Sequence, residues 1–127
     1  MAHGTRMALG ALVVALCASA AGDPLLHASA QGHALPPAAR CLQRAQAVTD
    51  LLDAQQVRLC TGATSVAPVE CFVQATESLL LTDVQGIALC RCATSLAPVE
   101  CVRRLRSEVR YTDPQMVQMC SAAGTCG

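Results

Sequence analysis

The sequence predicts an all-α fold, a small disulfide-stapled array of short antiparallel helical hairpins with a 30-residue repeat. Nearly the same text occurs twice, as CTGATSVAPVEC at 60–71 and as CRCATSLAPVEC at 90–101. The 127-residue chain has nine cysteines, but only one Phe, one Tyr and no Trp. Small aliphatic side chains contribute little burial energy each, so a fold of this size needs covalent cross-links.

Residues 1–20 have the three parts of a secretory signal peptide. Arg6 supplies a positive charge, an apolar run covers residues 7–18, and an Ala-Ser-Ala triplet ending at Ala20 is a small-residue cleavage site. A second Ala-Ser-Ala triplet makes cleavage after Ala30 the alternative. The apolar run is shorter than the roughly 20 residues that a membrane-spanning helix needs. We therefore expect a secreted, extracellular protein with no transmembrane segment.

Residues 21–40 are predicted to form a flexible leader. Pro24, Gly32 and the pair Pro36-Pro37 interrupt any helix there, and no apolar period emerges. Cys17 leaves with the signal peptide, so an even number of cysteines remains, as in the disulfide frameworks of small exported proteins. The cysteine-rich helical repeat domain is predicted to cover 41–127, in units 41–70, 71–100 and 101–127, the last one degenerate.

Each unit is predicted to contain two short helices. Thr64 or Ser65 is expected to cap the first helix of the second unit, with Pro68 in its first turn and Glu70 near the positive end of its dipole. The third unit has the equivalents one repeat later, at Thr94, Ser95, Pro98 and Glu100. The second helices are expected to begin with N-cap aspartates at Asp53, Asp83 and Asp113.

Apolar residues at helical spacing indicate the faces that these helices bury. For the first helices they are Leu42, Ala45 and Val48; Phe72, Ala75 and Leu79; Val102, Leu105 and Val109. For the second helices they are Val57, Leu59 and Cys60; Ile87, Leu89 and Cys90; Val117, Met119 and Cys120.

The spacing of the cysteines favours one disulfide within each hairpin. In an antiparallel helix pair, the cysteine that opens the first helix lies beside the cysteine that closes the second. The favoured pairs are Cys41–Cys60, Cys71–Cys90 and Cys101–Cys120, with Cys92–Cys126 tying the C-terminal tail to the second unit. The alternative scheme joins neighbouring units through Cys60–Cys71 and Cys90–Cys101.

No residue pattern points to catalysis, a metal or a cofactor. His27 and His33 fall in the leader, so a nucleophilic Ser or Cys has no histidine base in the repeat domain. Cys90-Arg91-Cys92 is the one arrangement that suggests thiolate metal binding, but the other soft ligands are distant in sequence. Glu70 and Glu100 are interpreted as helix-dipole partners rather than as an acid/base pair. We expect a protein that is not an enzyme.

Three arginines form the candidate partner-binding site. Arg103, Arg106 and Arg110 are spaced i, i+3 and i+7 and would share one helix face, suited to an anionic lipid, a sulfated glycan or an acidic protein. The alternative is a solvated face that Glu108 partly neutralises. The formal net charge of zero argues against nucleic acid as a partner.

Cys71 and Cys90 are separated by 18 residues, and Arg91 and Cys92 follow. This spacing is similar to part of the cysteine pattern of plant lipid-transfer proteins. That family has an adjacent Cys-Cys pair, which is absent here, and Cys101 has no counterpart in its order. The 30-residue repeat accounts for the same spacing, so we assign no family.

These observations predict a secreted, non-catalytic, cysteine-rich helical repeat protein. Its expected role is that of an extracellular binding or interaction module with a partner that the sequence does not identify. The alternative is a small carrier of apolar ligands or lipids, in which the aliphatic helices enclose a cavity.

Overall fold

The computed structural model describes residues 34–126, which contain six α-helices, one short 3₁₀ helix and no strand. The helices are α1 (Pro37–Val48), α2 (Asp53–Cys60), α3 (Ala67–Ser78), α4 (Asp83–Cys90), α5 (Ala97–Glu108), α6 (Asp113–Cys120) and the 3₁₀ helix η2 (Ala122–Thr125). The all-α prediction is therefore confirmed for this part of the chain. The predicted signal peptide and most of the predicted leader lie outside the described residues.

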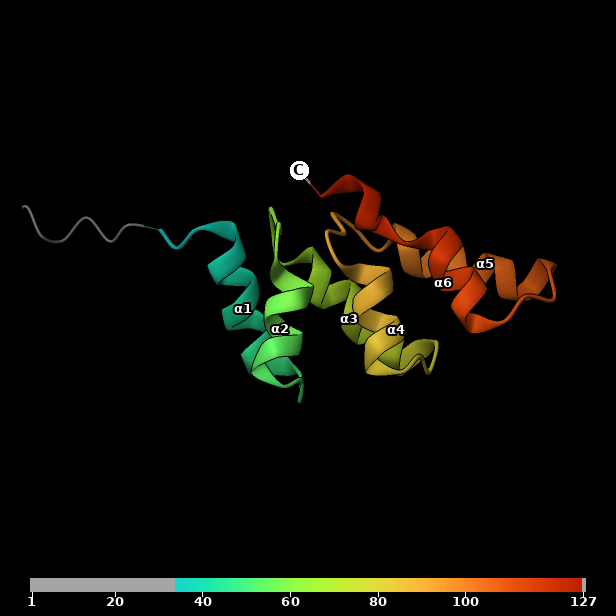
Figure 1. The fold of residues 1–127 in the computed structure, drawn as a ribbon, viewed down its shortest axis with the longest axis horizontal. Coiled ribbons are helices and arrows are strands. Elements are labelled where there is room, and N and C mark those ends of the chain that lie inside the picture. The colour runs from blue at the N-terminus through green and yellow to red at the C-terminus, as the bar shows by residue number, and fades with distance from the viewer. Residues whose placement is uncertain (1–33, 127) are drawn as a thin grey trace, which may run out of the picture. The chain divides into compact units, whose positions relative to one another are not determined.

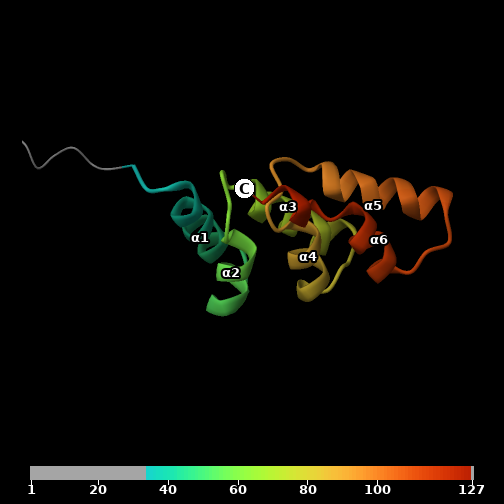
Figure 2. The ribbon, with the colours of Figure 1, turned by 45° about the horizontal axis from the view of Figure 1, so that its top comes forward.

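The helices form three hairpins, each a helix of 12 residues followed by one of 8. The long helix α3 contacts α1 and α5, and the short helix α4 contacts α2 and α6, so the long and short helices form two adjoining rows (Figures 1 and 2). The third hairpin contains both of the helices that are predicted for it. Sequence divergence after Cys120 alters the tail and leaves both helices of this hairpin intact.

The long helices begin earlier than Cys41 and its equivalents. α1 begins at Pro37, so the predicted leader is wrong at residues 37–40. Proline is favoured as the first residue of a helix, because the N–H that it lacks would have no partner there. Cys41 consequently lies one turn inside α1 rather than at its start.

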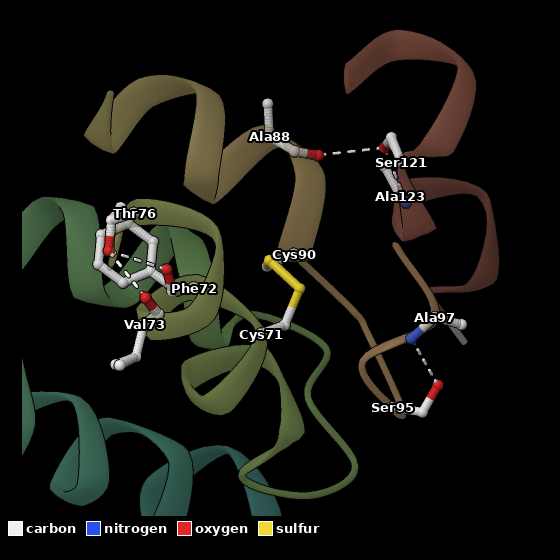
Figure 3. Close-up of a disulfide and its surroundings, with 10 residues drawn as sticks. All are labelled: Cys71, Phe72, Val73, Thr76, Ala88, Cys90, Ser95, Ala97, Ser121 and Ala123. Carbon is white, nitrogen blue, oxygen red and sulfur yellow. Dashed lines mark hydrogen bonds between the residues drawn. A yellow bond between two sulfur atoms is a disulfide. The ribbon is translucent and has the colours of Figure 1, made fainter. Parts of the chain in front are cut away.

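The predicted caps of α3 and α5 are displaced by one residue. Val66 and Leu96 occupy the N-cap positions and make no side-chain cap hydrogen bond. Ser65 still accepts a hydrogen bond, at 3.1 Å from the Ala67 N–H. The equivalent bond from Ala97 N–H to Ser95 is 3.2 Å long (Figure 3). Each serine therefore accepts a hydrogen bond from a backbone N–H of the first helical turn, although it lies one residue before the N-cap. Thr64 and Thr94 make no such hydrogen bond.

The short helices begin with the predicted aspartates, but these are first helical residues rather than N-caps. The N-cap of α4 is Thr82, whose N–H donates to Gln85 Oε1 at 3.0 Å while the Gln85 N–H donates to Thr82 Oγ1 at 3.4 Å. These reciprocal bonds form a capping box, which places the cap one residue before Asp83. Asp83 still lies near the positive end of the helix dipole.

Four disulfides cross-link the described residues in the predicted scheme. Cys41–Cys60, Cys71–Cys90 and Cys101–Cys120 each close one hairpin, with Cα–Cα distances of 5.6, 5.5 and 5.7 Å. Cys92–Cys126, with a Cα–Cα distance of 5.1 Å, ties the tail to the turn after α4. Six of the eight bonded cysteines are buried, so the cross-links are also part of the apolar core.

The core consists of aliphatic side chains from both rows, and three residues that we expected to be buried are exposed. Val48 of α1 is 38% exposed. Val57 is 52% exposed and Met119 is 61% exposed. Leu59 and Leu89, at the same position as Met119 in α2 and α4, are fully buried. Among the described residues no fourth hairpin follows α6, so nothing covers Met119. Val57 is exposed for the corresponding reason at the other end of the row of short helices, because no short helix precedes α2 among the described residues.

The central hairpin packs most extensively because of a small residue in α4. Gly86 is buried against α3, and a Cβ added to it would lie 2.9 Å from Phe72 Cδ2 and 3.3 Å from Thr76 Cγ2. At the same position, α2 has the buried side chain of Gln56 and α6 has that of Met116. The only phenylalanine of the chain thus fills space that Gly86 leaves open.

We predict that Gly86→Ala destabilises the fold. Overpacking costs about 1–3 kcal/mol, which exceeds the gain of roughly 1 kcal/mol expected from alanine in a helix interior. The control is Gly124→Ala, because a Cβ there has no neighbour within 4 Å. Urea denaturation should show a lower midpoint for Gly86→Ala only. Equal or higher stability of Gly86→Ala would contradict the tight α3–α4 contact.

We also predict that the double replacement Cys71→Ala, Cys90→Ala lowers the free energy of unfolding by about 3 kcal/mol, the chain-entropy value for a loop of this length. Urea denaturation under oxidising conditions measures it. The variant Cys92→Ala, Cys126→Ala is the comparison, since it removes a cross-link but leaves all three hairpins closed. The Cys92–Cys126 bond closes a longer loop, with a sequence separation of 34 against 19, so the same relation gives the comparison variant a loss of similar size. The prediction is contradicted if the first variant is as stable as the unchanged protein.

Candidate functional site

A groove of about 520 Å³ crosses the row of short helices. We call it the α4 groove. Side chains from α2, α4, α6 and the tail line it: Gln55, Arg58, Val84, Gln85, Ile87, Ala88, Arg91, Pro114, Val117, Gln118, Ser121 and Ala123.

One face of α4 forms the floor of this groove. Val84, Ile87 and Ala88 are spaced i, i+3 and i+4, which places them together on a helix, and Arg91 follows the last residue of α4. The lining residues of α2 and α6 occupy the same positions as those of α4, one repeat earlier and one repeat later. Gly86 lies on the other side of α4, against α3. The helix therefore buries one face in the core and presents the other to the groove.

The C-terminal tail forms one wall of the groove and is tied to α4 at two points. Ser121 Oγ donates a hydrogen bond of 3.1 Å to the Ala88 carbonyl, and it accepts one of 3.1 Å from the Ala123 N–H (Figure 3). The Cys92–Cys126 disulfide holds the end of the tail. The backbone of Cys92 has a positive φ of 64°, where the equivalent turn after α2 uses Gly62 at 76°.

The charged side chains of the groove are both arginines. Arg58 lies in the last turn of α2, and Arg91 follows the last residue of α4. Positive charge is favourable at both places because it complements the negative ends of the helix dipoles. Both residues are exposed, and neither has an ion-pair partner among residues 34–126. No carboxylate of these residues lines the groove, so its surface is apolar with unneutralised positive charge.

The predicted arginine face is not a single free cationic surface. Arg103 pairs with Glu100. Arg106 is used inside the fold, where it donates to the Leu79 carbonyl and to Asp113 Oδ1, both at 2.8 Å. Arg110 lies beyond the end of α5, because Val109 is extended with φ −135° and ψ 155°. The prediction that Arg110 shares a helix face with the other two is therefore wrong.

The two repeated glutamates each lie next to an arginine. Glu70 lies 3.6 Å from Arg44, and Glu100 pairs with Arg103. Within the described residues, no three or more His, Cys, Asp or Glu side chains gather where they could hold a metal ion. Cys90 and Cys92, which suggested a thiolate site, are both engaged in disulfides.

The comparisons find no matching family model, no similar curated protein and no similar solved structure. No helix formed by residues 34–126 is long and apolar enough to cross a membrane.

The groove was not predicted from the sequence. Ile87 and Val117 are predicted as buried helix residues and Arg91 as part of a Cys-x-Cys arrangement, whereas Val84, Ala88 and Arg58 carry no prediction. The available signal was variation at one repeat position, since Arg58, Ala88 and Gln118 are equivalent but differ in size and charge. Ala88 is shorter than Arg58 and Gln118 on the neighbouring helices, so the surface has a hollow at this position.

We predict that Arg106→Ala lowers the free energy of unfolding by about 1 kcal/mol, because the Leu79 carbonyl and Asp113 both lose a charged donor. The matched control is Arg104→Ala, an exposed arginine of the same helix with no ion pair in the described structure. Thermal or urea denaturation measures both. If the two variants lose the same stability, Arg106 has no special role in joining α5 to the end of α3.

Proposed function

We propose that the chain is a secreted, non-catalytic protein that binds an extracellular partner through the α4 groove. The observation that carries the proposal is the exposure of apolar side chains in a hollow of about 520 Å³, a size typical of binding sites. Val84 is 68% exposed, although it lies on the floor of the groove. Burying such a side chain against a partner is favourable.

The cross-linked scaffold supports a binding role because it is rigid. Each of the helices that shape the groove ends in a cysteine bonded to its own hairpin, at Cys60, Cys90 and Cys120. A surface that is ordered before binding loses little conformational entropy when a partner docks. The same four disulfides in a small domain favour an oxidising, extracellular compartment, which is compatible with the predicted secretion.

The chemistry of the lining supports a non-catalytic role. Its polar side chains are three glutamines, two arginines and Ser121, and the hydroxyl of that serine already bonds to the Ala88 carbonyl. An activated serine nucleophile requires an adjacent general base, which this set of side chains does not provide.

A carrier of small apolar ligands is the second candidate, and the apolar floor of the groove favours it. Carriers and cofactor sites enclose most of the ligand surface, however. Val84 and Ala88 are exposed on the floor, so a ligand lying there would keep one side in water. The open groove thus suits a protein or peptide partner better than a stored lipid.

We predict that Ala88→Gln blocks binding. Glutamine is the residue at the equivalent place of α6, so the change fills the groove without an unusual helix residue. The assay selects peptides from a phage-displayed random library on the oxidised protein and measures their affinity for each variant. Affinity should fall at least about tenfold for Ala88→Gln, in line with the loss of a central contact.

The control is Val57→Gln, another exposed position of a short helix that lies outside the groove. Its affinity for the selected peptides should match that of the unchanged protein. The proposed function is overturned if the library yields no binder, or if the selected peptides bind both variants equally well.

A further inference from the structure

We infer that the partner presents an acidic amphipathic α-helix, which lays its apolar stripe on α4 and directs its carboxylates to Arg58 and Arg91. This inference rests on the proposed function and names the chemistry of the partner. It follows from three features of the α4 groove, namely its apolar floor, its openness and its charge.

The apolar floor matches the side-chain spacing of a docked helix. Val84, Ile87 and Ala88 lie along one face of α4, and Pro114, Val117 and Ala123 continue the apolar surface toward the tail. An amphipathic helix lying in such a groove uses apolar side chains at i, i+3 or i+4 and i+7 as anchors. Those anchors would cover side chains that now face solvent, Val84 above all.

The openness of the groove favours a helix over a free acyl chain. Val84, Ala88, Pro114 and Gln118 are all exposed, so the groove has no roof within the described structure. A fatty acid bound there would leave much of its apolar surface in water. An amphipathic helix brings its own polar face, which points to solvent once the apolar stripe is buried.

The charge of the groove selects an acidic partner. Arg58 and Arg91 stand at its edge without ion pairs in residues 34–126, whereas Arg44, Arg103 and Arg106 all have carboxylate neighbours. No acidic residue of the described chain lines the groove. Guanidinium groups bind carboxylates through charge-assisted, often bidentate hydrogen bonds. Charge complementarity of this kind increases the association rate and discriminates against basic partners.

The test uses three fluorescein-labelled synthetic peptides of about 14 residues, long enough for a helix of about 21 Å. The first has Leu at i, i+3, i+4 and i+7 with flanking Glu. The second has Lys in place of every Glu, and the third has the residues of the first in an order that destroys the apolar stripe. Fluorescence anisotropy with the oxidised full-length protein, free of its signal peptide, gives each affinity.

The acidic amphipathic peptide should bind at least about tenfold more tightly than both others, and its affinity should fall as salt screens the arginines. The double variant Arg58→Ala, Arg91→Ala should weaken it about tenfold, through the loss of two charge pairs with carboxylates. The matched control Arg40→Ala, Arg104→Ala removes two exposed arginines outside the groove. It changes the net charge equally and should leave the affinity unchanged.

The inference is overturned if the three peptides bind alike, or if the double variant and its control lose the same affinity. If the acidic peptide fails while library-selected peptides still depend on Ala88, the partner is not an acidic helix but the proposed function stands. A fluorescent fatty acid is tested in parallel. Suppose that the fatty acid binds, that Ala88→Gln abolishes this binding, and that no peptide binds. Both proposals are then overturned in favour of a carrier.

Discussion

The disulfide within each hairpin is the constraint on which the rest of the structure depends. It joins a cysteine one turn inside the long helix to the last residue of the short one, as between Cys71 and Cys90. A helix of 8 residues is unstable alone in water, so α2, α4 and α6 exist because they are held against a neighbour. Most of the bonded cysteines are buried, and they supply core volume in a chain with a single phenylalanine.

Contacts specific to the central hairpin hold its two helices together and join it to the third hairpin. Gly86 lets α4 lie close to Phe72, and the carbonyl of Leu79 at the end of α3 accepts a hydrogen bond from Arg106 of α5. The chain then turns through Leu80, whose φ of 54° is costly for a non-glycine residue by about 1 kcal/mol or more. The bond from Leu81 N–H to the Ala75 carbonyl, 3.2 Å long, closes this turn.

Three hairpins of the same helix lengths carry different surfaces, and the α4 groove is the example. Positions that recur once in every repeat hold the backbone in the same arrangement, while Arg58, Ala88 and Gln118 differ at one of them. The small residue stands on the middle helix, so the longer neighbours flank it. The tail adds a further wall, and the Cys92–Cys126 disulfide that holds it has no equivalent elsewhere in the described units. The groove thus arises without disturbing the core.

The residues alone were enough to predict the helical hairpins and the cysteine pairing, because both follow from local spacing along the chain. The caps were misplaced by one residue, since the reciprocal bonds of Thr82 and Gln85 compete with the aspartate that follows. Only the folded chain could decide which apolar residues stay exposed, as Val57 and Met119 do at the two ends of the short-helix row. The folded chain also decided which arginines have partners. Arg106 binds Leu79 and Asp113, and these contacts join residues that are distant along the chain. Arg58 and Arg91 have no ion pair among the described residues.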